Sequence, residues 1–287
     1  MRHLLGTYSF TISEPVNAFF KYTQVLPNIV SKMSEDAKAL YNKGLALLRL
    51  ERSREAIECF DRALEIDPRY AAAWFDKGAA LLKLNRPDEA LVCFDKSLEI
   101  DSRNARTWYN KSASLARLGR HDEAIECSDR ALKIDPRLAE AWLGKGMDLE
   151  RSGRYEEAIE CYNKVLEINP RMGSAWYNKG TALFRLYRFD DAIECFDRAL
   201  EINPRQAEAW SQKGVALVSL NRAYEAMPCC DKALEINFRD AGAWGTKGLA
   251  LVALKRYDEA LVCLDRALEI DPGFQVAREL RDSLRRR

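Results

Sequence analysis

The sequence predicts an all-α solenoid built from tandem helix pairs. Six tryptophans recur every 34 residues, and Leu40 occupies the same position one period upstream. A fixed period in this range is the signature of a repeat protein, in which each repeat packs mainly against its neighbours. The repeated tryptophans are Trp74, Trp108, Trp142, Trp176, Trp210 and Trp244.

Seven tandem units follow from this spacing, with a different segment at each end. Residues 1–36 fit no repeat and are predicted to form an N-terminal extension, with a helix from Pro15 to Pro27. Residues 275–287 are predicted to form an amphipathic capping helix with Val276 and Leu284 facing inward, because solenoids need a polar-backed cap. The units are 37–70, 71–104, 105–138, 139–172, 173–206, 207–240 and 241–274.

Each unit contains the pattern of two short helices. In the second unit, Trp74, Gly78 and Leu81 fall on one helix face. Pro87 then opens a second helix, where its missing N–H costs nothing, and Phe94 belongs to the apolar stripe of that helix. Every unit is therefore predicted to be a helix–turn–helix.

Turn residues mark both ends of the second helix. Gly119, Gly153 and their counterparts Asn85 and Asn221 tolerate the left-handed conformation that ends many first helices. Proline closes the second helix in five units, whereas Ser102 and Phe238 replace it, so those two junctions are expected to be less sharply broken. The five prolines are Pro68, Pro136, Pro170, Pro204 and Pro272.

Glycine recurs inside the first helix, four residues after the tryptophan position. Glycine costs a helix about 0.8–1 kcal/mol relative to alanine, so its repetition indicates that a bulky group lies against the bare backbone. The tryptophan is the expected filler. The glycines are Gly44, Gly78, Gly146, Gly180, Gly214 and Gly248.

Taken together, the order tryptophan, glycine, leucine, alanine, aromatic, alanine, proline resembles the tetratricopeptide repeat (TPR) over residues 37–274. The resemblance implies that the helix pairs form a right-handed superhelix. One departure is that lysine stands before the glycine, where the family usually has leucine. Each lysine either packs its stem and extends its head to water, or contributes to a basic functional ladder. The lysines are Lys43, Lys77, Lys111, Lys145, Lys179, Lys213 and Lys247.

In the family that the chain resembles, the first helices line a concave groove. Its residues lie one, two, five, eight and nine positions after the tryptophan. In this chain the first five units offer aromatic, amide and basic side chains there, whereas units six and seven are small and apolar. The candidate peptide-binding residues are Tyr41, Asn42, Arg49, Phe75, Lys83, Tyr109, Asn110, Arg117, Arg151, Tyr177, Asn178 and Arg185.

These residue types favour a peptide ligand. Asparagine both donates and accepts toward an extended backbone, and arginine presents a planar fork that fits a carboxylate. We therefore expect a protein-interaction scaffold that binds an extended, acidic-leaning peptide or a partner helix. A chaperone-tail clamp of lysine and asparagine is not supported, because Tyr41, Phe75 or Tyr109 stand where its lysines should be.

The composition limits the other functions. The net charge of +1 argues against a dedicated nucleic-acid binder, although tyrosine–arginine interleaving leaves an RNA-binding solenoid as a third hypothesis. A regulatory or targeting subunit of an enzyme complex is the second. No apolar run is long enough to span a membrane, and the N-terminus lacks a signal-peptide pattern, so we expect a cytoplasmic protein.

No catalytic, cofactor or metal site is predicted. The only histidines are His3 and His121, and the sequence contains no phosphate-binding loop, nucleophile elbow or zinc motif. Cysteine recurs at one repeat position, and neighbouring repeats place equivalent helices too far apart for disulfides. The cysteines are therefore expected to be reduced, half-buried packing residues.

Units three and four carry polar residues at interior positions. Ser112 replaces the repeated glycine, Ser128 replaces an aromatic, and Asp148 replaces an alanine. Buried hydroxyls and carboxylates cost free energy unless they are paired. Either these groups pair with each other, or residues 105–172 form the least stable part of the solenoid, with weak protection against hydrogen exchange.

Overall fold

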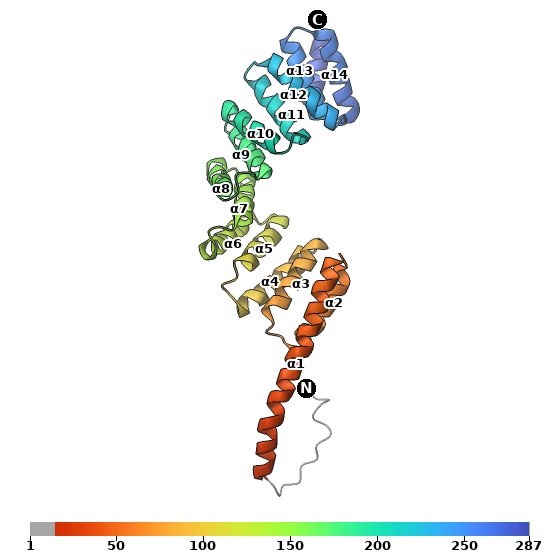
Figure 1. Ribbon diagram of the computed structural model, residues 1–287. Helices are drawn as coiled ribbons and strands as arrows, with labels where there is room; N and C mark the ends of the chain where they lie inside the picture. Colours follow the sequence, from red (N-terminus) through yellow and green to blue (C-terminus); the bar gives the residue numbers. More distant parts are fainter. Residues whose placement is uncertain (1–14, 287) are drawn as a thin grey trace. The chain divides into compact units, whose positions relative to one another are not determined.

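In the computed structural model, residues 15–286 are described, and they form fifteen α-helices (Figure 1). The prediction of an all-α fold of tandem helix pairs is confirmed. The helices are α1 (Pro15–Arg49), α2 (Ser53–Ile66), α3 (Ala71–Lys83), α4 (Pro87–Ile100), α5 (Ala105–Arg117), α6 (His121–Ile134), α7 (Ala139–Arg151), α8 (Tyr155–Ile168), α9 (Gly173–Arg185), α10 (Phe189–Ile202), α11 (Ala207–Ser219), α12 (Ala223–Ile236), α13 (Ala241–Ala253), α14 (Tyr257–Ile270) and α15 (Gln275–Arg285).

The chain divides within α5 into two compact units, residues 1–114 and residues 115–287. In the first unit, α1 packs on α2, and α3 packs on α4. In the second, the pairs α7/α8, α9/α10, α11/α12 and α13/α14 follow the same pattern. Within each unit, the second helix of one repeat also contacts the first helix of the next, as α2 does with α3, α6 with α7, α8 with α9, α10 with α11, and α12 with α13.

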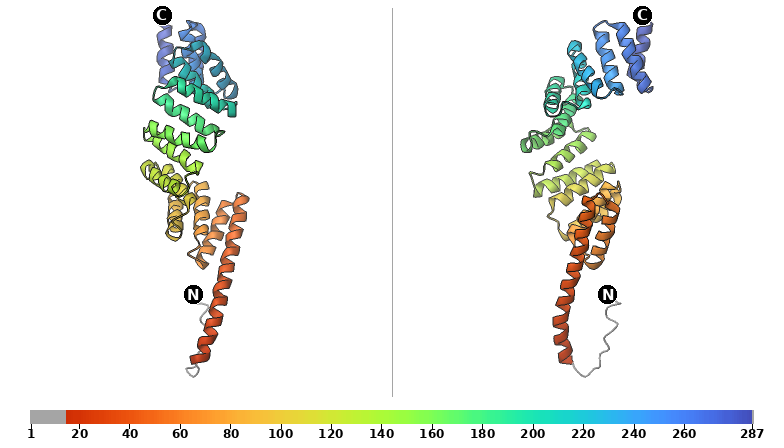
Figure 2. Two further views of the ribbon diagram at one scale, coloured as in Figure 1. Left: turned by 60° about the vertical axis from the view of Figure 1, so that its left-hand side comes forward. Right: turned by 45° about the vertical axis from the view of Figure 1, so that its right-hand side comes forward.

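The first helix is longer than predicted. Instead of ending at Pro27, α1 continues without a break to Arg49 and includes the first helix of repeat one. Its N-terminal part extends beyond α2 (Figure 2).

The helix ends follow the repeat with little variation. The turn position has positive φ in every repeat, including Gly119 at 74° and Asn85 at 57°. Contrary to expectation, α4 and α12 end at the same repeat position as the helices followed by proline. The side chains of Asp101 and Asn237 each accept a backbone N–H two residues on, at 3.0 and 3.1 Å, and these turns end the helices without proline.

The repeated glycine faces the second helix of its own repeat, and tryptophan is not its filler. A Cβ added to Gly78 would lie 2.7 Å from the Phe94 ring, and one added to Gly146 would lie 2.6 Å from the Tyr162 ring. Glycine is therefore needed where an aromatic ring packs against the backbone. The prediction failed because the second-helix aromatic reaches the glycine across the helix pair.

The tryptophans instead join each repeat to the turn before it. The Nε1–H of Trp74 donates to the carbonyl oxygen of Pro68 at 3.0 Å, and the other five tryptophans repeat this bond at 2.9–3.0 Å. The side chains are half-buried, with their polar edge satisfied.

The repeated lysines have a structural partner. Five of them pair with an aspartate of the preceding repeat at 2.5–2.6 Å, for example Lys145 with Asp129. Six of them, including Lys145 and Lys179, also lie over the tryptophan of their own repeat, at 5.3–5.8 Å from the ring centroid. These contacts favour packing over a functional ladder.

The polar interior residues pair only in part. Asp148 accepts a hydrogen bond from Nδ1 of His121 at 2.8 Å, and Ser112 donates to the carbonyl of Tyr109 at 2.8 Å. Among the described side chains, the buried hydroxyls of Thr107 and Ser128 have no hydrogen-bond partner. Both belong to repeat three, which is consistent with the predicted low stability there.

The C-terminal cap α15 packs on α14 and α13. Ala277 and Leu284 are its buried residues, whereas Val276, which was expected to face inward, is 53% exposed. Arg285 pairs with Asp265 at 2.7 Å and fixes the end of the cap to α14.

Candidate functional site

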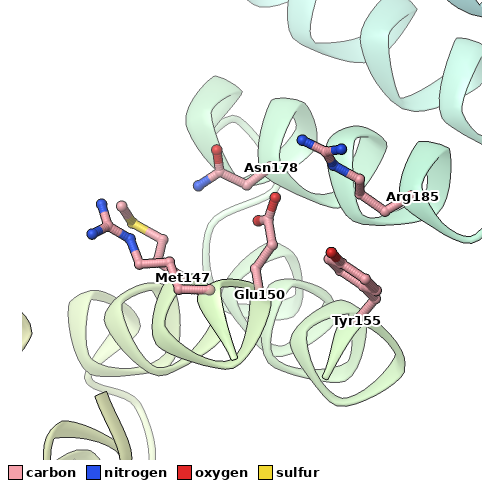
Figure 3. A pocket seen from close by; sticks show the side chains of 6 residues that line it. Met147, Glu150, Tyr155, Asn178 and Arg185 are labelled. Atoms are coloured by element: carbon pink, nitrogen blue, oxygen red, sulfur yellow. The ribbon is translucent and has the colours of Figure 1, made fainter. Parts of the chain in front are cut away.

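A pocket of about 330 Å³ is lined by α7 and α9, the first helices of repeats four and five, and by the start of α8 (Figure 3). Met147, Glu150 and Arg151 come from the last turns of α7, and Tyr155 opens α8. Asn178 and Arg185 line the pocket from α9. The site is therefore assembled from two consecutive repeats.

Three of the predicted groove residues meet in this pocket: Arg151, Asn178 and Arg185. Arg151 and Arg185 occupy the same position in successive repeats, nine residues after the tryptophan, so the stacking of first helices brings them to one site. Both side chains are exposed, and neither guanidinium forms an ion pair with the part of the chain that is described.

Sequence reasoning missed the other three pocket residues. Met147 and Glu150 lie five and eight positions after Trp142, on the groove positions of the family, but were not singled out. Tyr155 lies on a second helix, outside the first-helix positions. For Glu150 a signal existed, because the other repeats have Leu48, Leu82, Ala116, Phe184, Val218 and Val252 at its position.

Glu150 is the acidic group of the pocket. Its carboxylate points toward Asn178 and Arg185 in Figure 3, and its Oε2 accepts a hydrogen bond from the Tyr162 hydroxyl at 3.0 Å. Burial raises the pKa of Glu150, while the Tyr162 hydrogen bond and the charges of Arg185 and Arg151 lower it. The net effect is a pKa above the ordinary value for glutamate.

The predicted residues of repeats one and two have a different environment. The Tyr41 hydroxyl donates to Asp76 at 2.8 Å, and the Tyr41 ring lies 4.8 Å from that of Tyr70. Burial and the Asp76 carboxylate raise the pKa of Tyr41. Two groups that could face a ligand in repeats one and two are therefore bonded to each other.

The aromatic members of the predicted set also support the fold. Tyr41, Phe75 and Tyr177 each pack on the second-helix aromatic of their own repeat, with ring centroids 5.9–6.1 Å apart. They are half-buried, so only part of each side chain is available to a ligand. Asn42, Arg49, Lys83 and Arg117 are exposed, and Tyr109 and Asn110 are half-buried.

The described residues, in the pocket and elsewhere, were compared with what a metal site, a membrane-spanning helix or a reactive thiol requires. Among the described residues, no three potential metal ligands converge, and no helix combines the length and apolar character needed to cross a membrane. All eight cysteines are free and buried. Burial raises the pKa of the Cys161 thiol to about 11, so this thiol stays protonated and unreactive at neutral pH.

Comparison with protein families identifies the repeats. Models described as tetratricopeptide repeat match residues 37–70, 71–104 and 241–274, residues 103–171, and residues 143–204 and 177–238. The ranges 37–70, 71–104 and 241–274 coincide with units derived from the tryptophan spacing, whereas the other matches begin and end at other residues. No curated protein matches the chain.

Solved structures with the same fold are numerous. The chain is similar to YrrB, described as a TPR protein with an unusual peptide-binding site, at 26% identity and a TM-score of 0.58, over 66% of this chain and 97% of YrrB. A TPR protein from Cytophaga hutchinsonii, crystallised as its C-terminal part, has 16% identity and a TM-score of 0.68, over 84% and 98%. A tetratricopeptide repeat protein from Parabacteroides merdae has 17% identity and a TM-score of 0.63, over 88% of this chain and 99% of that protein's chain.

The family matches, the helix pairs and the structural likenesses agree. The chain belongs to the tetratricopeptide-repeat family, whose repeats bind proteins and peptides.

Proposed function

We propose that this chain is a non-catalytic protein-interaction module that binds an extended peptide segment of its partner across α7 and α9. The observation that carries the proposal is the pocket in which Arg151, Asn178 and Arg185 meet. The description of YrrB as a peptide binder supports the same class of ligand.

The side chains around the pocket suit a peptide. The Asn178 amide has no hydrogen-bond partner among the described residues, so it is available to donate to and accept from a peptide backbone. Tyr155 and Met147 add apolar contact area at the rim, and Met147 is 41% exposed. A peptide that covers these groups would bury apolar surface and would also form hydrogen bonds with the Asn178 amide.

An acidic partner segment fits the charges along this face. Arg151 and Arg185 are exposed and form no ion pair with any described residue, and Arg117 is a third exposed arginine at the same repeat position. A guanidinium forms two parallel hydrogen bonds with a carboxylate, which adds directional specificity to the attraction. We therefore propose that acidic residues flank the segment that enters the pocket.

The experiment selects peptides from a displayed random library on the full chain, then measures affinity for the best one. Replacing Arg151 and Arg185 together by glutamate is expected to weaken binding at least about tenfold, because hydrogen bonds to charged groups contribute about 1.5–3 kcal/mol each. Arg171→Glu is the matched control, an exposed arginine between α8 and α9 that does not line the pocket. Equal affinity of the double variant and the control would refute the proposed site.

We also propose the cytoplasm as the compartment in which the module acts. Eight buried thiols without a disulfide suit a reducing environment. Fractionation of the source cells with an antibody against the chain tests this assignment, and recovery from an oxidising compartment would contradict it.

A further inference from the structure

Repeat four contains a glutamate–tyrosine pair that the fold does not require. The position of Glu150 is apolar in all six other repeats. The position of Tyr162 is phenylalanine in Phe60, Phe94 and Phe196, which fill the same space against glycine without a hydroxyl. Both departures occur in one repeat, and the two side chains are hydrogen-bonded to each other at 3.0 Å.

The pair fixes an acceptor inside the pocket. Tyr162 is fully buried, and its ring packs against the backbone at Gly146, so its hydroxyl has little freedom. The Tyr162 hydroxyl donates a hydrogen bond to Oε2 of Glu150, and the carboxylate points toward Asn178 and Arg185 (Figure 3). Half-burying a carboxylate costs free energy, and the other repeats form the same helix pair without one, so this departure points to a role in binding.

The lining therefore presents acceptors and donors together. Glu150 only accepts, Arg151 and Arg185 only donate, and Asn178 does both. A carboxylate in the pocket would face the charge of Glu150, and an ammonium group would face both guanidinium groups. A primary carboxamide offers N–H donors to Glu150 and a carbonyl oxygen to an arginine, without a charge that either side repels.

We propose that the pocket recognises the carboxamide side chain of a glutamine or asparagine in the bound peptide, with Glu150 as the residue that determines this specificity. The inference rests on the proposed peptide-binding function and refines it. Acidic residues of the partner lie outside the pocket, where Arg151 and Arg185 reach solvent, and a neutral amide enters it.

The test uses capped alanine pentapeptides that differ only in the central residue, which is glutamine, glutamate, lysine or alanine. The chain contains five methionines, so ¹³C-methyl labelling gives few signals, and the Met147 methyl reports on the pocket directly. The titration is run at slightly alkaline pH, because burial raises the pKa of Glu150 and a lower pH would favour its protonated form. The glutamine peptide is expected to bind at least about tenfold more tightly than the other three, the smallest factor that one hydrogen bond to a charged group provides.

Two variants assign that preference to the glutamate–tyrosine pair. Glu150→Gln leaves the two arginines unopposed, so the order of the glutamine and glutamate peptides should reverse. Tyr162→Phe keeps the ring but releases the carboxylate, and the preference should fall. Glu140→Gln, an exposed glutamate in the first turn of α7, removes the same charge away from the pocket and should leave the preference unchanged.

The outcomes separate this inference from the proposed function. Equal or tighter binding of the glutamate peptide to the unmodified chain overturns the carboxamide assignment alone. An unchanged glutamine preference in Glu150→Gln also overturns it. If no pentapeptide moves the Met147 signal and library-selected peptides bind without regard to Arg151 and Arg185, the proposed function falls as well.

Discussion

Within residues 115–287, two contacts between the first helices of consecutive repeats differ in their side chains and in their packing. We call these contacts junctions. Between α7 and α9, Met147, Glu150, Asn178 and Arg185 line an open pocket. Between α11 and α13, the same repeat positions hold Val215, Val218, Thr246 and Ala253. There α11 and α13 make more extensive contact, and a Cβ added to Gly214 would lie 3.7 Å from Thr246.

The difference shows how one repeat produces both an open pocket and a closed interior. Small residues allow two helices to approach until no ligand-sized space is left. Long polar residues keep the same two positions apart and supply groups for a ligand. The tryptophan, glycine and lysine positions are the same at both junctions, so the presence of the pocket depends on the variable positions.

The largest expected effect comes from crowding the closed junction. Gly214 is buried on α11, and a Cβ added there would lie 3.2 Å from Cys230 and 3.7 Å from Thr246 of α13. Gly214→Leu should lower the free energy of unfolding by about 3 kcal/mol, because Cys230 and Thr246 are themselves buried and leave no room for the added side chain. Urea denaturation measures the change, and a loss below about 1 kcal/mol would mean that this junction is looser than described.

Bulk added at the open junction should affect binding more than stability. Asn178→Trp fills space in the pocket, so the free energy of unfolding should change by less than about 1 kcal/mol. Affinity for the selected peptide should fall at least about tenfold, since one free amide and the pocket volume are both lost. Ser174→Trp, on the exposed first turn of α9, is the control, and an equal loss of affinity there would argue against the pocket.

A smaller effect is expected when the hydrogen bond between repeats one and two is introduced between repeats four and five. Tyr41 donates to Asp76, and Leu143 and Asn178 stand at the corresponding positions of repeats four and five. Leu143→Tyr should bring a hydroxyl to Asn178 and weaken peptide binding by about threefold relative to Leu143→Phe, which adds the ring alone. Calorimetric titration compares the two, and identical affinities would show that Asn178 does not contact the peptide.

The smallest effect concerns Asp148, on α7, where α11 has Ala216. Burial raises the pKa of Asp148, against the opposing hydrogen bond from His121. A carboxyl with a raised pKa binds its proton more tightly in the folded chain, so stability decreases as the pH rises through the folded-state value. Asp148→Asn should therefore be more stable at neutral pH, by up to about 1 kcal/mol, with no gain in acid.

Urea denaturation at several pH values measures this difference, with the exposed Asp122→Asn as the control. A lower stability of Asp148→Asn at neutral pH would mean that the pairing of Asp148 with His121 outweighs the cost of burial.

The repeat spacing was sufficient to predict the helix pairs, but some packing roles were not visible in it. A helical pattern shows which residues share a face, whereas the partner of Gly146 depends on how two helices cross, so Tyr162 was missed as its neighbour. The helix through Pro27 was also missed, because local signals favour a break there.

The site was predictable where it follows the repeat. Arg151, Asn178 and Arg185 recur at fixed positions and were found, whereas Tyr155 joins the pocket from a second helix. Glu150 was detectable as the one polar residue at an apolar position, a signal that requires comparing repeats with each other. The Tyr41 hydroxyl is bonded because Asp76 of the next repeat lies beside it, whereas the Asn178 amide has no partner among the described residues, and single-repeat patterns do not show this difference.

A crystal structure of the chain with a library-selected peptide tests the central claim most directly. The peptide is expected to cross α7 and α9, with its backbone at Asn178 and one side chain between Glu150 and Arg185. A peptide seated on α11 and α13, or against the second helices, would contradict the assignment of the binding site.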